Sequence, residues 1–152
     1  MGAQVNECFQ KIHSLIGYAA EVESLVLSRY GRPLTALQLA DARLVGVREP
    51  GKIRLANPYA FIEADPRFTV LLHLGPALAG LTVGYAFILN STLTGKRDVL
   101  LHECAHVAQY EKLGLNGFLR QYFAEYERYG YEKMSLEQEA IAAANQVIFS
   151  RP

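Results

Sequence analysis

The residues with the clearest chemical potential form a five-residue motif, His102-Glu103-Cys104-Ala105-His106, in which the two histidines are four positions apart. Side chains four apart on a helix lie on the same face, so both imidazoles can reach one metal ion. Zinc accepts imidazole nitrogen, and in catalytic sites it keeps one position open for water. Glu103 lies beside this stripe, where it can take a proton from that water without being a ligand. The motif therefore predicts a zinc-dependent hydrolase and favours a peptidase.

The motif lies in a segment that is apolar almost all round, as is typical of a buried helix. Val99–Leu101 precedes the motif, and Val107–Ala108 follows it. Cys104 lies about 200° round the helix from the first histidine, so we expect its thiol to point into the core and not at the metal. His13 and His73 have no partner at ligand spacing, and we interpret them as structural or surface residues.

A catalytic zinc site needs a third protein ligand, and the last predicted helix supplies the candidates. Glu137 and Glu139 lie about 200° apart on a helix, so only one of them can face the metal. Glu137 shares its helix face with small or apolar residues that can pack against the motif helix, namely Ala140, Ile141 and Ala144. We therefore predict that Glu137 is the third ligand and that Glu139 is solvated.

Peptide hydrolysis also needs a hydrogen-bond donor for the oxyanion that develops on the scissile carbonyl. Five of the nine tyrosines lie between the predicted ligands: Tyr110, Tyr122, Tyr126, Tyr129 and Tyr131. Tyr110 is one helical turn beyond His106, whereas Tyr129 and Tyr131 flank a glycine. We predict that Tyr131 is the donor, with Tyr110 and Tyr129 as alternatives. Most of these tyrosines would otherwise pack with the hydroxyl at the surface.

Length, charge and cysteine content exclude several classes of protein. A chain of 152 residues is long enough for one domain with a real core. The formal net charge is zero and the pI is near neutral, so we expect no nucleic-acid partner. Two cysteines, Cys8 and Cys104, form no disulfide framework, and no signal peptide is recognisable, so we expect a cytoplasmic location. Composition leaves the oligomeric state open.

One uncharged stretch, Phe68 to Gly95, is long enough to span a bilayer. It contains several glycines, a proline, an asparagine and threonines, so we interpret it as a loop followed by a strand. We therefore expect no membrane span. A membrane-associated protein that uses Phe68 to Phe87 is the interpretation that this argument disfavours.

The remaining pattern predicts a mostly helical α+β domain with a small sheet beside the motif helix. Residues 1–50 would form the N-terminal helices, residues 51–97 the sheet and loops, and residues 98–152 the zinc-site helices. The predicted helices are Val5 to Arg29, Thr35 to Gly46, Asp98 to Leu113, Asn116 to Tyr129 and Ser135 to Phe149. The predicted strands are Lys52 to Leu55 and Leu81 to Asn90.

Local signals mark the boundaries of these elements. Thr35 with Gln38, and Ser135 with Gln138, have the spacing of a capping box at a helix start. Gly31, Gly114 and Gly130 are expected to end the helices that precede them, and Asn116 to cap the helix that follows. Turns are expected at Asn57-Pro58 and Asp65-Pro66.

Two segments of the chain resemble the gluzincins: the motif with the residues after it, His102 to Tyr110, and the later segment Leu136-Glu137-Gln138-Glu139-Ala140. The chain is most similar to minimal gluzincins, the CAAX prenyl-protease-like peptidases and the small zinc-peptidase-like domains of phage-tail-like assemblies. The resemblance covers roughly Leu81 to Ala144 and implies that His102 and His106 are zinc ligands and Glu103 the general base. Their Glu-x-x-Ala-Asp segment places the third ligand on Glu137. It also implies that the segment Leu81 to Asn90, with Gly84, is a strand lining the cleft.

The chain departs from this pattern at Ile141, where the family has an aspartate that supports a ligand histidine. Such support typically contributes ten- to a hundredfold in metal affinity or activity. Two alternatives follow: Asn145, on the same helix face, takes this role, or the zinc is held less tightly.

These inferences favour a zinc metalloendopeptidase acting on a peptide or protein, with the substrate paired to the edge strand from Thr82 to Leu89. The alternative is a catalytically silent zinc-binding module that acts as a scaffold or recognition domain. Ile141 and the small size favour that module, whereas an intact Glu103 disfavours it, because a structural zinc site needs no general base.

Overall fold

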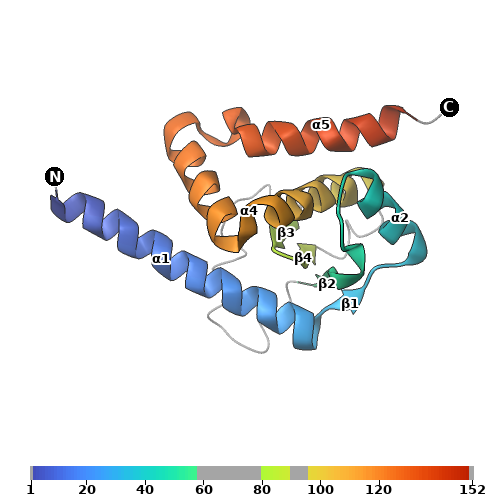
Figure 1. The fold of residues 1–152 in the computed structure, drawn as a ribbon, viewed down its shortest axis with the longest axis horizontal. Coiled ribbons are helices and arrows are strands. Elements are labelled where there is room, and N and C mark those ends of the chain that lie inside the picture. Colours follow the sequence, from blue (N-terminus) through green and yellow to red (C-terminus); the bar gives the residue numbers. More distant parts are fainter. Residues whose placement is uncertain (1, 58–79, 90–95, 151–152) are drawn as a thin grey trace.

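A computed structural model describes residues 2–57, 80–89 and 96–150 of the chain (Figure 1). The helices within them are α1 (Gly2–Leu25), α2 (Ala36–Leu44), α4 (Arg97–Tyr129) and α5 (Ser135–Phe149), with short helical turns at Val26–Tyr30, Pro50–Lys52 and Tyr131–Lys133. The strands are β1 (Arg32–Pro33), β2 (Arg54–Ala56), β3 (Gly80–Val83) and β4 (Ala86–Leu89). The predicted α+β class, mostly helical with a small sheet, is confirmed.

Several predictions fall wholly or partly outside the described residues. The turns at Asn57-Pro58 and Asp65-Pro66, the histidine at position 73 and most of the uncharged stretch are among them. Within the described residues, none of the helices combines the length and the apolar content that a bilayer crossing requires.

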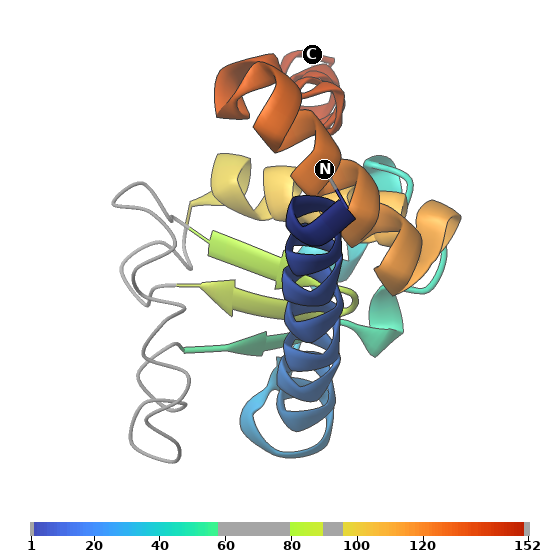
Figure 2. The same cartoon turned by 90° about the vertical axis from the view of Figure 1, so that its left-hand side faces the viewer.

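The strands form a mixed sheet in the order β1-β2-β4-β3, in which β2 and β4 are parallel and the other pairs antiparallel. Successive side chains of β4 point to opposite faces. Ala86 and Ile88 pack with α1, whereas Phe87 and Leu89 pack with α2 and α4. All of β4 is therefore buried, and Figure 2 shows α1 crossing the strands on one side.

The first two predicted helices are confirmed. The Thr35 hydroxyl accepts a hydrogen bond from the Gln38 amide, and the Gln38 side chain accepts one from the Thr35 amide, so both halves of the capping box form. The strand expected at Lys52–Leu55 begins later, at Arg54, because Pro50–Lys52 closes a helical turn first.

The single strand predicted from Leu81 to Asn90 is wrong, because the chain reverses within it. A tight turn at Gly84-Tyr85 separates β3 from β4, and Gly84 has a φ of 60°, which favours glycine. The Tyr85 amide donates to Oε2 of Glu23 on α1 at 3.1 Å. Tertiary contact with α1 thus supports a turn that the β-branched composition did not predict.

The predicted break at Gly114 is confirmed. Gly114 lies inside the long helix α4, but its φ of 74° and ψ of 164° are not helical, so the segments on either side of it run in different directions. Asn116 does not begin the second segment, which already includes Leu115, and its side chain accepts from the Arg120 guanidinium. The bend in α4 therefore coincides with the non-helical conformation of Gly114.

The capping box predicted at Ser135 is also wrong. Met134 occupies the cap position of α5 without a side-chain cap. The Ser135 hydroxyl instead donates to the carboxylate of Glu125 on α4, which also accepts from the Leu136 amide at 3.2 Å. A carboxylate from another helix segment thus replaces the local cap.

Candidate metal centre

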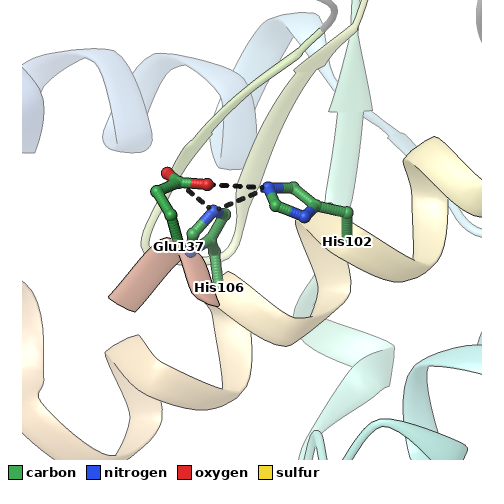
Figure 3. Close-up of side chains that lie close together, drawn as sticks. All are labelled: His102, His106 and Glu137. Carbon is green, nitrogen blue, oxygen red and sulfur yellow. Dashed lines mark hydrogen bonds and ion pairs between the residues drawn. The ribbon is translucent and has the colours of Figure 1, made fainter. Parts of the chain in front are cut away.

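Three potential metal ligands converge from α4 and α5 (Figure 3). The Nε2 atoms of His102 and His106 are 3.1 Å apart. Oε2 of Glu137 lies 3.1 Å from Nε2 of His102, and Oε1 lies 3.3 Å from Nε2 of His106. These residues could hold a metal ion, and the three side chains are those that the sequence predicted.

Helix packing explains why Glu137 reaches the histidines. α4 and α5 share a small apolar cluster of Leu101, Ala144 and Val147, and Leu136 is buried beside the aromatic residues of α4. Glu137 follows Leu136 at the start of α5, and its side chain is buried between the two helices. The bend at Gly114 lets the chain return so that the beginning of α5 meets the motif.

Gln109 holds the second histidine and was missed by the sequence reasoning. Its Oε1 lies 2.8 Å from Nδ1 of His106, and its Nε2 donates to the Leu136 carbonyl at 2.9 Å and to Glu139 at 3.3 Å. Because the Gln109 amide nitrogen is used in this way, the oxygen faces the imidazole and accepts from Nδ1. Nε2 of neutral His106 then carries a lone pair directed at the site.

The prediction that Asn145 supports a ligand histidine is wrong for His106, because the side chain that contacts the second nitrogen of His106 is Gln109. Asn145 is exposed on α5, and Ile141 is 43% exposed. Gln109 fills the role for His106 from the motif helix itself. Its position three residues after the histidine, on the same helix face, is the signal that could have identified it.

Two tyrosines bracket the carboxylate of Glu137. The Tyr122 hydroxyl donates to Oε1 at 3.1 Å, and the Tyr131 hydroxyl donates to Oε2 at 3.2 Å. Tyr131 is 53% exposed, so its hydroxyl lies at the site while its ring borders solvent. The structure thus brings the predicted Tyr131 to the ligand cluster together with Tyr122.

The other tyrosines considered from the sequence lie elsewhere. Tyr110 is buried, and its hydroxyl donates to the Thr82 carbonyl at 3.1 Å. Tyr126 and Tyr129 are exposed, and the Arg128 guanidinium lies over the Tyr129 ring. Tyr110 therefore joins α4 to the sheet, which the sequence could not show.

The charges of the cluster raise the pKa of His106 and lower the pKa of Glu137. Burial alone would lower the pKa of His106, but the hydrogen bond to Glu137 and the charges of Glu103 and Glu137 raise it above its ordinary 6.5. Burial alone would raise the pKa of Glu137, yet the two histidines hold it well below its usual range. Without a metal, the carboxylate is therefore ionised and favours a positive charge on the adjacent imidazoles.

Glu103 is buried between the motif helix and the sheet, with 7% of its surface exposed. The Thr82 hydroxyl on β3 donates to its Oε2. Its charge contributes to the raised pKa values of His106, Tyr122 and Tyr131, so the carboxylate acts electrostatically on the same site. Cys104 is fully buried in the core between α4 and the sheet, where burial raises the pKa of its thiol.

Comparisons with protein-family models, with curated proteins and with solved structures found no match to this chain.

Proposed function

We propose that the protein is a zinc-dependent metalloendopeptidase of gluzincin type. The spacing of the three donors is the observation that carries this proposal. Nitrogen and oxygen ligands of tetrahedral zinc lie about 3.3 Å from one another, given bond lengths of roughly 2.0–2.2 Å. The two imidazole nitrogens are 3.1 Å apart, Oε2 of Glu137 is 3.1 Å from the nitrogen of His102, and the other oxygen, Oε1, is 3.3 Å from that of His106, so each histidine has a carboxylate oxygen near this spacing.

The chemistry of the donors supports zinc over the other common divalent ions. Calcium and magnesium prefer oxygen ligands, whereas two imidazoles with one carboxylate form a usual catalytic zinc set. Gln109 presents Nε2 of His106 in the unprotonated form that a metal requires. Tyr122 and Tyr131 orient the carboxylate of Glu137. Three protein ligands leave a fourth position for water and substrate.

Zinc at this position would lower the pKa of a bound water toward ~7 and polarise the scissile carbonyl. Glu103 takes one proton from the water as the water oxygen adds to the carbonyl carbon. The same proton then passes from Glu103 to the peptide nitrogen and the carbon–nitrogen bond breaks. The second water proton passes from the new carboxyl group to the amine, so that a carboxylate and an ammonium group leave. Glu103 ends the cycle ionised, as it began.

Tyr131 is the proposed donor to the oxyanion. Burial and the Glu137 charge raise the pKa of Tyr131 to about 12, so the hydroxyl keeps its proton at neutral pH. In the described geometry this proton is directed at Glu137, at the border of the site with solvent. Rotation of the exposed side chain would redirect it to a bound carbonyl.

The proposed substrate is an extended peptide or protein segment paired with the sheet edge. Among the described strands, β3 pairs only with β4, whereas β4 lies between β2 and β3. The edge expected from Thr82 to Leu89 is thus restricted to β3 among the described strands. At Thr82 the carbonyl already accepts from Tyr110, which leaves the Gly80 end for pairing.

The test compares zinc content with cleavage of an unstructured protein such as casein. We expect about one zinc per chain, lost in His102→Ala and His106→Ala. Glu103→Gln should keep zinc and fold while kcat falls at least about 100-fold, because the amide cannot accept the water proton. Glu139→Gln, an exposed change beside the site, is the matched control and should keep both. Absence of zinc from protein purified without chelator at neutral pH contradicts the proposal.

A catalytically silent zinc module is the alternative, favoured by the hydrogen bond from Thr82 that holds one oxygen of Glu103 in the interior. Zinc-loaded wild-type protein that cleaves nothing, and whose stability and zinc content resemble those of Glu103→Gln, would support the module.

A further inference from the structure

The two oxygens of the Glu103 carboxylate have different surroundings. Oε2 accepts from the hydroxyl of Thr82, which is itself only 7% exposed. A threonine hydroxyl has one proton, and the shorter contact, to Oε2, takes it in preference to the Glu103 backbone carbonyl at 3.4 Å. Among residues 14–57, 80–89 and 96–150, whose side chains the structure describes, no side chain donates to Oε1 of Glu103. One oxygen is therefore held, and the other has no side-chain donor within this part of the chain.

Gly80 lies next to Oε1 of Glu103, and because it has no side chain it leaves the space beside that oxygen open. A Cβ placed on Gly80 would lie 3.1 Å from Oε1 of Glu103 and 2.8 Å from Cδ1 of Leu89. Gly80 and Thr82 are two apart on β3, so both lie on the face of the strand that contacts the Glu103 carboxylate. A glycine at this position therefore keeps Oε1 accessible.

Thr82 is held in place from the same helix that carries Glu103. Its carbonyl accepts from the buried Tyr110 hydroxyl at 3.1 Å, two turns further along α4. Main chain and side chain of Thr82 thus both bond to α4, and β3 cannot shift relative to Glu103 without breaking one of these bonds. A carboxylate held by these bonds is already ordered, so it loses little conformational entropy when it accepts a proton.

We propose that Thr82 is a positioning residue for Glu103: it fixes Oε2 and thereby makes Oε1, under Gly80, the oxygen that exchanges the proton. This inference rests on the proposed function. The water proton moves to Oε1 and from there to the leaving nitrogen, while the Thr82 hydroxyl keeps its own proton throughout. The two strand residues thus divide one carboxylate into a held oxygen and a reacting oxygen.

The test uses the zinc-loaded full chain and two readouts, turnover of casein and the affinity for acetohydroxamic acid. A hydroxamic acid binds zinc as its anion, and its proton goes to a nearby base, so its affinity reports on Glu103 even without turnover. Thr82→Val keeps the shape but removes the donor. We expect the hydroxamate Kd to rise and kcat to fall by about 10- to 100-fold, with KM and zinc affinity unchanged.

Thr82→Ser restores the donor and is the matched control, expected to stay within about threefold of wild type. Thr82→Val protein that keeps zinc and binds the hydroxamate as wild type does would overturn the inference. Should Thr82→Val fail to fold, Gly80→Ala decides: its methyl group beside Oε1 should weaken hydroxamate binding, and wild-type affinity in that variant overturns the proposal.

The two readouts also separate the positioning role from the proposed function. Wild-type protein that cleaves nothing, but whose hydroxamate affinity depends on Thr82 and Glu103, contradicts the peptidase and supports the positioning role. Zinc-loaded wild-type protein that does not bind the hydroxamate contradicts both, because the metal then offers no open position.

Discussion

Oε1 of Gln109 lies 2.8 Å from Nδ1 of His106, and Gln109 follows this histidine by about one turn of α4. The same side chain donates to the Leu136 carbonyl, so it joins the motif helix to the start of α5, beside Glu137. One residue thereby contacts a candidate ligand and links the two elements that carry the candidate ligands.

Replacement of Gln109 should weaken metal binding without unfolding the protein. Gln109→Ala removes the acceptor of His106, and we expect zinc affinity to fall about 10- to 100-fold in competition with a chromophoric chelator. Gln146→Ala, at an exposed position of α5, is the control. Equal affinities in the two variants would show that Gln109 does not support the site.

The two glutamates at the start of α5 should differ sharply. Glu137 is 3% exposed and lies within 3.3 Å of both imidazoles, whereas Glu139 is exposed and contacts Gln109. Glu137→Ala should reduce zinc affinity by more than the roughly 100-fold upper limit expected of a supporting residue. Glu139→Ala should change it little. A larger effect at Glu139, measured by the same titration, would place the third ligand on the other helix face.

Metal removal should destabilise the folded state. In its absence two imidazole nitrogens and a carboxylate face one another within 3.3 Å. Zinc that binds only the folded chain stabilises it by about 4 kcal/mol at a free concentration roughly 1,000 times its Kd. We expect EDTA to lower the Tm, and readdition of zinc, but not of magnesium, to restore it. A Tm that is insensitive to chelator would mean that no bound metal supports the fold.

Gly84 should tolerate substitution poorly. It has a φ of 60°, and a Cβ there would overlap Oε2 of Glu23. We expect Gly84→Ala to cost about 1–3 kcal/mol in urea unfolding, from backbone strain and the lost contact with α1. Gly51→Ala is the matched control, since nothing lies within 4 Å of its Cβ position and its φ is not positive. Equal stability of the two variants would argue against the hairpin.

The start of α5 should depend on pH through Glu125. Burial alone would raise the pKa of Glu125, but hydrogen bonds from Ser135, Gln121 and the Leu136 amide lower it below its ordinary 4.5. A lowered folded-state pKa means that the stabilisation is present above the unfolded pKa and is lost as pH falls through the folded value. Glu125→Ala should cost about 1 kcal/mol at pH 7 and less at pH 3. Denaturant midpoints at both pH values provide the measurement, and a cost independent of pH would contradict this account.

Much of this protein could be read from local sequence. The spacing of His102 and His106 places two imidazoles on one helix face whatever surrounds them, because the period of the α-helix is fixed. The side of α5 that Glu137 occupies followed from the small residues that share its face. The capping box at Thr35 and the break at Gly114 were equally local, since each depends on backbone groups within a few residues.

Only the tertiary structure decided which residues support the two histidines, Glu103 and Glu137 and the elements that carry them. The cap of α5 comes from Glu125 and not from Ser135, and the strand before the motif folds into a hairpin held by Glu23. Thr82 meets Glu103 across 21 positions of the chain, a contact without a sequence period. Buried polar groups take whichever partner the packing brings within hydrogen-bond distance, because leaving them unpaired costs about 1–3 kcal/mol each. Local periodicity cannot foresee that choice when the partners lie on different elements.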